Sequence, residues 1–220
     1  MMVRYMLFDL DGTLTDSVSG ITNCATYALE KFGIYPAYRE ELLPYIGPPL
    51  MHSFMTFHGL TKEQAEQAVT YYRERFSTIG WRENEVYDGI PELLGELQGR
   101  GVSLMVATSK PEMFTHRILE HFDLAKYFTF IAGSTLDDRR SKKEDVIAFI
   151  REKYPEINAG NCVMIGDRKY DVVGAHSQDL PVVGVLYGYG DRAEMEMVGA
   201  DYIAEDVAAL RKRLLSMIGK

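Results

Sequence analysis

The apolar residues of this chain follow two patterns, continuous short runs and a helical periodicity. The apolar run from Tyr5 to Leu10 predicts a buried parallel strand near the N-terminus. From residue 18 onward the apolar positions recur every three or four residues, which is the spacing of one face of an amphipathic helix. No strand pattern occurs between residues 16 and 84, so we expect that segment to be a helical block.

Two helices are predicted with some detail inside the helical block. The first has the apolar face Val18, Ile21, Ala25, Ala28 and Phe32. Asp16 or Ser17 can cap its start, and Gly33 ends it. The second follows a capping box formed by Thr61 and Gln64. Its apolar face is Ala65, Ala68, Val69, Tyr72, Phe76 and Ile79. Between these helices, prolines break the chain into short helical pieces.

A repeating order of strand, loop and helix begins near Tyr87. Strands are expected at 103–108, 128–132, 162–166, 182–186 and 202–204, with a closing helix near 207–217. This alternation is typical of an α/β protein, with a Rossmann-like parallel sheet core and helices on both faces. The helical block interrupts it after the first strand. We therefore expect an α/β core domain at 1–15 and 85–220, with an inserted all-α cap domain at 16–84.

Composition narrows the class of protein. The 220 residues are 46% hydrophobic and 25% charged, as in an ordinary globular protein, and the net charge is −8. An acidic chain without basic blocks argues against nucleic acid or a membrane surface as partner. Cys24 and Cys162 form neither a disulfide framework nor a zinc spacing, which favours a cytoplasmic location. No signal-peptide layout and no membrane-spanning apolar run is found.

Candidate chemistry begins with the acidic pair at the end of the first strand. Asp9 and Asp11 are two residues apart, so their side chains share one face. Two neighbouring carboxylates repel each other unless a cation lies between them or one is protonated. Gly12 allows a tight turn, and Thr13 adds a hydroxyl group. Taken alone, this stretch is also compatible with a strand that ends in an acidic turn.

Other polar groups follow the later strands. Thr108-Ser109-Lys110 ends the second strand, and a basic loop from Arg139 to Lys143 follows the third. The fourth strand ends in Gly166-Asp167, with Asp171 four residues further on. Parallel sheets bind ligands beyond the carboxyl ends of their strands. These acids, hydroxyls and lysines are therefore expected to converge on one edge of the sheet.

This arrangement resembles the haloacid-dehalogenase-like hydrolases, whose four motifs occur in the same order. The resemblance implies that Asp9 is the nucleophile, forming an aspartyl-phosphate, and that Asp11 is the general acid and then base. It implies phosphate contacts from Thr108, the Ser109 amide and Lys143, although Lys142 stays an alternative to Lys143. Thr108 alone is also compatible with a helix cap, and Lys142 and Lys143 alone with a solvated run of charge.

The resemblance also implies a Mg²⁺ cofactor. Its ligands would be Asp9, Asp167 and the backbone carbonyl of Asp11, with Asp171 helping directly or through water. The implied activity is hydrolysis of a small phosphorylated metabolite, with phosphoglycolate as the leading candidate. A 5′-nucleotidase, a sugar phosphomutase and a phosphate-responsive binding protein without turnover are the alternatives. Thr13-Leu14 stands where mutases of this family usually carry Val-Ile, which favours hydrolysis.

Two loops complete the expected site. The segment from Tyr45 to Leu50 resembles the cap loop of phosphoglycolate-phosphatase-like members and is a candidate for reaching the substrate, with an ordinary helix connection as the alternative. Residues 188–193 look like a dinucleotide fingerprint, but they follow the fifth strand, whereas that fingerprint belongs after the first. We expect a glycine-rich loop at the rim of the site.

Overall fold

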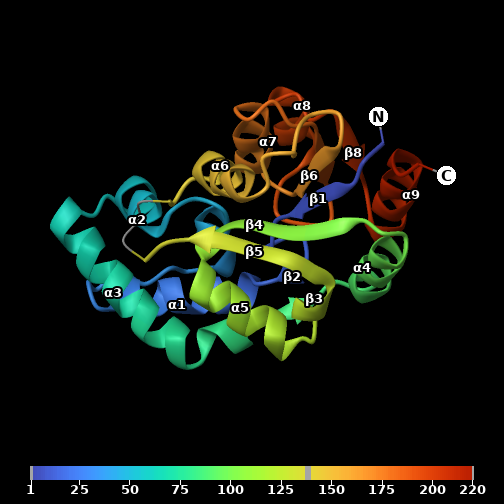
Figure 1. The fold of residues 1–220 in the computed structure, drawn as a ribbon. Helices are drawn as coiled ribbons and strands as arrows, with labels where there is room; N and C mark the ends of the chain where they lie inside the picture. Colours follow the sequence, from blue (N-terminus) through green and yellow to red (C-terminus); the bar gives the residue numbers. More distant parts are fainter. Residues whose placement is uncertain (1, 137–139, 220) are drawn as a thin grey trace. The chain divides into compact units, whose positions relative to one another are not determined.

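The computed structural model describes residues 2–136 and 140–219, and its ribbon is drawn in Figure 1. The chain divides into two compact units, one comprising Met1–Thr15 with Val86–Lys220 and the other Asp16–Glu85. The chain crosses from one unit to the other at two short strands, β2 (Thr15–Asp16) and β3 (Glu85–Val86), which belong to a two-stranded sheet.

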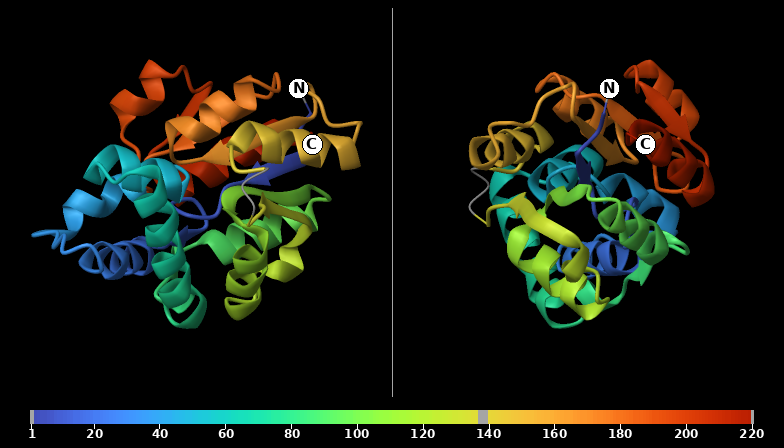
Figure 2. Two further views of the ribbon diagram at one scale, coloured as in Figure 1. Left: turned by 90° about the vertical axis from the view of Figure 1, so that its left-hand side faces the viewer. Right: turned by 45° about the vertical axis from the view of Figure 1, so that its right-hand side comes forward.

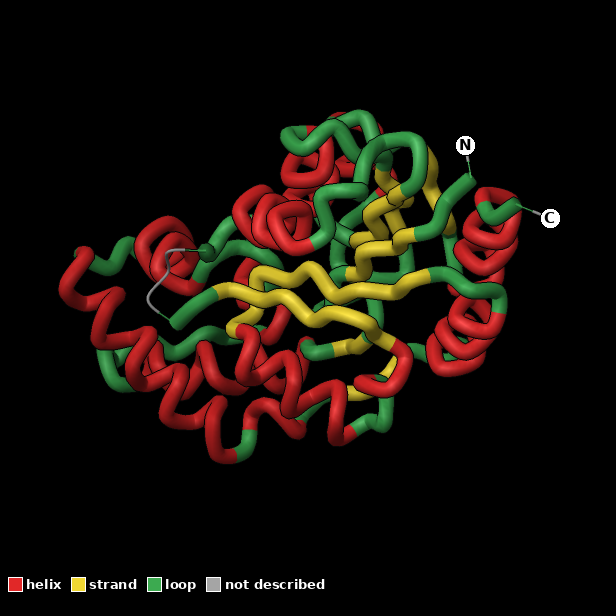
Figure 3. Tube along the Cα trace, in the orientation of Figure 1, coloured by secondary structure: helices red, strands yellow, loops and turns green. Residues whose placement is uncertain are grey.

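The first unit is built on a six-stranded parallel sheet with the order β5-β4-β1-β6-β7-β8. The strands are β1 (Tyr5–Phe8), β4 (Ser103–Pro111), β5 (Phe128–Ser134), β6 (Cys162–Gly166), β7 (Val182–Val185) and β8 (Tyr202–Ala204). They appear in Figure 3 as the yellow segments of the tube. The predicted α/β class and its parallel sheet are confirmed.

The helices of this unit alternate with the strands. They are α4 (Ile90–Gly99), α5 (Glu112–His121), η3 (Ala125–Tyr127), α6 (Lys143–Lys153), α7 (Lys169–His176), α8 (Arg192–Met197) and α9 (Val207–Met217). Helix α6 lies on one side of β4 and β5, and α5 lies on the other (Figures 1 and 2). Helices thus cover both faces, which keeps the apolar side chains of the central strands out of water.

Strand β1 lies at the centre of the sheet, between β4 and β6. Phe8 is aligned with Val106 on one neighbour and with Ile165 on the other. Phe8 and Ile165 are fully buried, as expected for strands covered on both faces. The residues that follow these three strands, which are distant in sequence, therefore emerge side by side at the same edge.

Strand β4 is longer than the sequence indicated, because it continues beyond Thr108 to Pro111. Its pairing with β5 aligns Ala107 with Ala132 and then Pro111 with Ser134. An advance of four residues along β4 thus matches an advance of two residues along β5, so the pairing of the two strands is irregular in this stretch. This irregularity contains all three residues of the predicted Thr-Ser-Lys motif.

Helices joined by short non-helical segments make up the interior of the second unit. It contains α1 (Val18–Glu30), the 3₁₀ helix η1 (Arg39–Tyr45), α2 (Leu50–His58), α3 (Lys62–Thr78) and the 3₁₀ helix η2 (Gly80–Arg82). The capping box of Thr61 and Gln64 is confirmed. The prediction for Ile79 is wrong, because α3 ends at Thr78 and the Ile79 side chain is 49% exposed.

Cys24 and Cys162 are both buried, and neither forms a disulfide. Within residues 2–136 and 140–219, no helix combines the length and the apolar character needed to cross a bilayer.

Candidate active site

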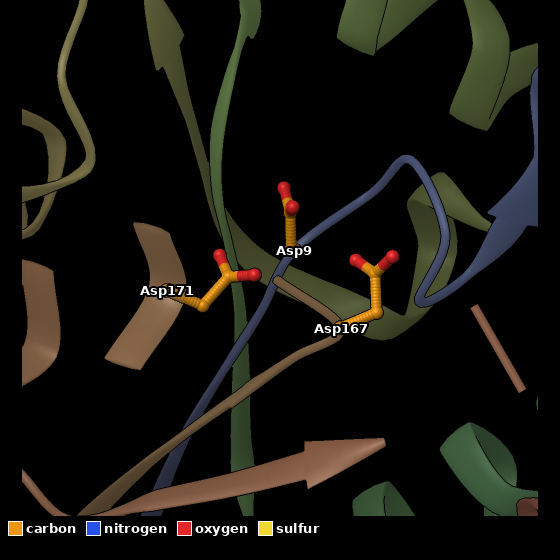
Figure 4. A group of neighbouring side chains, drawn as sticks. All are labelled: Asp9, Asp167 and Asp171. Atoms are coloured by element: carbon orange, nitrogen blue, oxygen red, sulfur yellow. The ribbon is translucent and has the colours of Figure 1, made fainter. Parts of the chain in front are cut away.

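Three buried aspartates meet at the carboxyl edge of the sheet. One carboxylate oxygen from each of Asp9, Asp167 and Asp171 lies within 4.8 Å of the others. Their exposed fractions are 7%, 0% and 1%. Figure 4 shows Asp9 on the segment that follows β1, whereas the other two come from the segment after β6. Two parts of the sequence more than a hundred residues apart thus build one acidic group, which we call the acid triad.

The sheet itself positions the first member of the triad. The amide of Asp9 donates to the carbonyl of Ile165 at 2.9 Å, which continues the pairing of β1 with β6 by one residue. The Leu10 amide then donates to Asp9 Oδ1 at 2.7 Å. The orientation of the Asp9 carboxylate is therefore set by the backbone that carries it.

Glycine is needed at two positions beside the triad. Gly12 has a φ of +82°, which side-chain-bearing residues rarely adopt, and a Cβ there would lie 2.1 Å from Asp167 Oδ2. A Cβ on Gly166 would lie 2.2 Å from the Asp171 carboxyl carbon. Both glycines allow a carboxylate to pack directly against the backbone, which explains the Asp-Gly and Gly-Asp pairs of the sequence.

Lys143 is the cation within this group. Its Nζ lies 2.8 Å from Asp9 Oδ1 and 2.8 Å from Asp171 Oδ1, and it also donates to the Ala107 carbonyl at 2.8 Å. The residue is only 3% exposed. Lys142, the alternative left open by the sequence, has a 69% exposed side chain that lies 3.7 Å from Glu144. The structure therefore brings Lys143, and not Lys142, to the acids.

Asp167 and Asp171 also have donors of their own. Thr13 Oγ1 donates to Asp167 Oδ1 at 3.3 Å, and the Tyr189 amide donates to Asp167 Oδ2 at 2.8 Å. The Arg168 amide donates to Asp171 Oδ2 at 3.0 Å, which caps helix α7. The sequence placed the loop at 188–193 at the rim of the site but did not identify Tyr189 as a donor, since a backbone contact depends on the fold rather than on residue type.

Burial and mutual repulsion shift the pKa values of the acids in the triad. Burial, together with the nearby Asp171 carboxylate, raises the pKa of Asp9 to about 6 even though Lys143 opposes the shift. Burial raises the pKa of Asp167 well above its usual range, and the carboxylates of Asp171 and Asp9 add to the effect. Burial alone would lower the pKa of Lys143, but the same acids raise it, so this lysine stays charged.

These observations fit a divalent cation. Three carboxylates and one ammonium group leave two formal negative charges in a buried space. The available donor atoms are oxygens, which are the ligands that Mg²⁺ prefers. A cation of charge two would balance the group and favour the ionised form of the carboxyl groups.

The remaining predicted residues lie next to the triad or at the same strand end. The Asp11 carboxylate is not part of the triad; it contacts Lys110 Nζ through both oxygens, at 2.8 and 2.6 Å. Thr108 is 1% exposed, and its hydroxyl accepts from the Lys110 amide at 3.3 Å. Ser109 is half-buried. Lys110 was not among the predicted site residues, because its contact with Asp11 depends on the irregular pairing of β4 with β5.

Arg168, which follows Asp167 in the sequence, pairs its Nε with Glu194 Oε1 of helix α8 at 2.9 Å. Glu194 also accepts from the Lys169 amide at 2.8 Å. This pair fixes the start of α7 and so supports the position of Asp171. Arg139 of the predicted basic loop lies outside the described residues.

Comparison with known proteins agrees with this geometry. Residues 6–185 match the family described as haloacid dehalogenase-like hydrolase. A 5′-nucleotidase from Pseudomonas aeruginosa is 44% identical over 97% of this chain and 97% of its own. A phosphoglycolate phosphatase from Vibrio parahaemolyticus is 27% identical over 94% of each chain.

A tyrosine-protein kinase, PtkA from Mycobacterium tuberculosis, is 42% identical over 85% of this chain. The matched part covers 63% of the length of that kinase. Among solved structures, a predicted phosphatase from Clostridium acetobutylicum superposes with a TM-score of 0.95 at 48% identity, covering 98% of this chain and 100% of that one. The family match spans β1 to β7 and includes every residue of the acid triad. The chain belongs to the haloacid dehalogenase-like hydrolase family.

Proposed function

We propose that this protein is a phosphoric monoester hydrolase that depends on a divalent cation, with Mg²⁺ as the expected ion, and uses Asp9 as its nucleophile. The observation that carries the proposal is the acid triad around Lys143, whose buried carboxylates exceed the positive charge beside them. A site of this kind has a strong affinity for a cation and, once the cation is present, for an anionic ester. Family membership supports the same reaction class.

Asp9 is suited to nucleophilic attack by its fixed orientation. The Leu10 amide and Lys143 both contact Oδ1, so we assign the attack on phosphorus to Oδ2. The new bond joins Asp9 to phosphorus as the ester oxygen leaves, and Asp11 gives that oxygen a proton. Asp11 then removes a proton from the water that cleaves the aspartyl-phosphate, which releases inorganic phosphate and restores Asp9.

The bound cation would be held by Asp9 and Asp167, with Asp171 and the backbone carbonyl of Asp11 as further ligands. When bound, it supplies positive charge that offsets the repulsion between a carboxylate and an anionic ester. Thr108 and the Ser109 amide are the proposed donors to the phosphoryl oxygens. Lys143 is the third, and its two acid contacts hold it at the point where phosphoryl charge would develop.

For the substrate, we propose a nucleoside 5′-monophosphate ahead of phosphoglycolate. The sequence alone favoured phosphoglycolate, but the relative named a 5′-nucleotidase is 44% identical, whereas the phosphoglycolate phosphatase is 27% identical. We propose that the helical unit is a cap domain that sets this preference, with residues 45–50 as the segment that contacts the leaving group. The shared chemistry of both candidates is a phosphate monoester of a small alcohol.

The test is release of inorganic phosphate by the purified chain from nucleoside 5′-monophosphates, 2-phosphoglycolate and p-nitrophenyl phosphate, with Mg²⁺ and with a chelator. We expect Mg²⁺-dependent release that Asp9→Asn abolishes while the variant stays folded. A parallel assay follows phosphoryl transfer from ATP to a tyrosine peptide, because one relative is named a kinase. Transfer to the peptide without ester hydrolysis would overturn the proposal, as would hydrolysis that survives Asp9→Asn.

A further inference from the structure

Lys110 holds the carboxylate of Asp11 from a different part of the sheet. The Nζ atom lies 2.8 Å from Oδ1 and 2.6 Å from Oδ2, across 99 positions of sequence. The two side chains are 5% and 13% exposed. A charge-assisted contact of one ammonium group with both oxygens holds the carboxyl group in position.

The backbone of β4 is shaped for this contact. Lys110 lies within the irregular stretch between Ala107 and Pro111, where the β4 ladder departs from regular pairing with β5. Its own amide donates to Thr108 Oγ1 at 3.3 Å, so the same turn of backbone orients the proposed phosphate donor. Such irregularities re-aim side chains next to active sites. Here the side chain that is re-aimed reaches the residue proposed to move the proton.

We propose that Lys110 is a positioning residue for proton transfer, which orients the Asp11 carboxyl group toward the leaving oxygen of the ester. This inference rests on the proposed function. Lys110 itself neither gains nor loses a proton: the proton that reaches the leaving oxygen comes from Asp11, as the phosphorus–oxygen bond breaks. Its contribution is the geometry of the donor, to which proton transfer is sensitive.

Leaving groups of different basicity isolate this role. An alkoxide must be protonated as it departs, whereas p-nitrophenolate is stable without a proton. We expect Lys110→Met to lower kcat about 100-fold for an alkyl phosphate such as a nucleoside 5′-monophosphate, because general acid catalysis typically contributes a factor of about that size. For p-nitrophenyl phosphate we expect kcat to fall only about threefold. Lys142→Met, which removes an exposed lysine from the basic loop, is the matched control and should change neither rate.

Lys110→Arg provides the second variant, because it keeps the charge but replaces the compact ammonium with a planar fork. We expect this variant to fold even if Lys110→Met does not. Its kcat should fall about tenfold for the alkyl ester, and its kcat for the aryl ester should change little. Equal losses for both leaving groups would overturn the proposal, since they would assign Lys110 to phosphate binding or to folding. Wild-type kcat for both esters in either folded variant would also overturn it.

The proposed function can fail independently of this inference. If wild-type protein released no phosphate from either ester, the phosphatase proposal itself would be lost and Lys110 would have no proton transfer to support. If wild-type protein is active and Asp9→Asn is not, the leaving-group comparison reports on Lys110 alone.

Discussion

Two clusters of charged side chains, one partly buried in the helical unit and one buried in the α/β unit, show opposite pKa shifts. In the helical unit, Glu83 receives two hydrogen bonds from Arg75, at 2.6 and 2.9 Å, and a third from Asn23 at 3.1 Å. The Arg75 guanidinium holds the pKa of Glu83 below its usual value. In the α/β unit, burial raises the pKa of Asp9 to about 6 although Lys143 is in contact with it.

The contrast separates a balanced ion pair from a group of acids with an excess of negative charge. Glu83 has one charge and a bidentate partner, so the pair is balanced within the protein. Within residues 2–136 and 140–219, the acid triad brings three carboxylates together, and Lys143 contacts two of them, so negative charge is in excess there. Raised carboxyl pKa values caused by burial and like charge are common at functional sites.

The largest expected effect is the loss of turnover caused by a substitution in the acid triad. Asp9→Asn should lower turnover of p-nitrophenyl phosphate by about four orders of magnitude or more, because it removes the nucleophile. It should not lower the melting temperature, since it relieves repulsion within the triad. Steady-state kinetics and thermal unfolding measure both. A variant that is inactive only because it is unfolded would leave the nucleophile assignment without support.

The next effect is the dependence of stability on pH in the absence of metal. The folded pKa of Asp9, about 6, lies above the value of 3.8 for an unperturbed aspartate. Between these values the native state binds more protons than the unfolded state, so the free energy of unfolding falls as pH rises from about 4 to about 7. The loss is on the order of 3 kcal/mol. Urea unfolding with a chelator present measures it.

Asp9→Asn is the control for that pH profile, because it should flatten the slope. Glu83 has the opposite effect on the pH dependence. Its pKa is lower in the folded state than in the unfolded chain, so it stabilises the fold at pH values above about 4.5. This stability is lost as the pH falls below that value. A stability that rose steadily between pH 4 and pH 7 in chelator would contradict the raised pKa of Asp9.

Adding a divalent cation should stabilise the α/β unit at neutral pH. At a Mg²⁺ concentration 100 times its dissociation constant, the expected gain is about 2.7 kcal/mol. Thermal unfolding with and without Mg²⁺ measures it, and Asp167→Asn should reduce the gain, because it removes one of the proposed ligands. An equal gain in the variant would place the cation elsewhere.

The smallest effect is expected at the balanced pair. Glu83→Gln should lower the free energy of unfolding by about 1–3 kcal/mol, because it leaves the Arg75 guanidinium without its carboxylate. Turnover of p-nitrophenyl phosphate should stay near the wild-type value, because the ion pair has no part in the chemistry. Chemical unfolding and kinetics on the same preparation measure the two quantities. A large loss of kcat at unchanged stability would mean that this pair is functional after all.

The sequence predicted the fold well where local pattern decides structure. Strand β6 was placed at its observed bounds because a continuous apolar run ends in Gly166-Asp167. The capping box at Thr61 marked the start of α3 for a similar reason, since both of its hydrogen bonds join residues three apart. Asp9 and Asp167 were expected to lie close together because parallel strands end at a common edge, and the structure brings them together with Asp171 and Lys143, which the family resemblance had indicated.

The sequence did not predict features that depend on contacts between distant backbone segments. The pairing of Lys110 with Asp11 requires the irregular ladder of β4, for which the residues from Ala107 to Pro111 give no local signal. The Tyr189 amide reaches Asp167 only because the loop after β7 folds against it. The exposure of Ile79 follows from the end of α3 one residue earlier, a boundary that apolar spacing alone does not locate.

The most direct test of the account is to trap the phosphorylated residue. Protein quenched in acid during turnover with Mg²⁺ and substrate is reduced with borohydride, which converts an aspartyl-phosphate to homoserine, and the peptides are then sequenced by mass spectrometry. The account predicts homoserine at position 9, dependent on substrate and absent from Asp9→Asn. Homoserine at position 11 or 167 instead, or continued turnover by the Asp9→Asn protein, would contradict it.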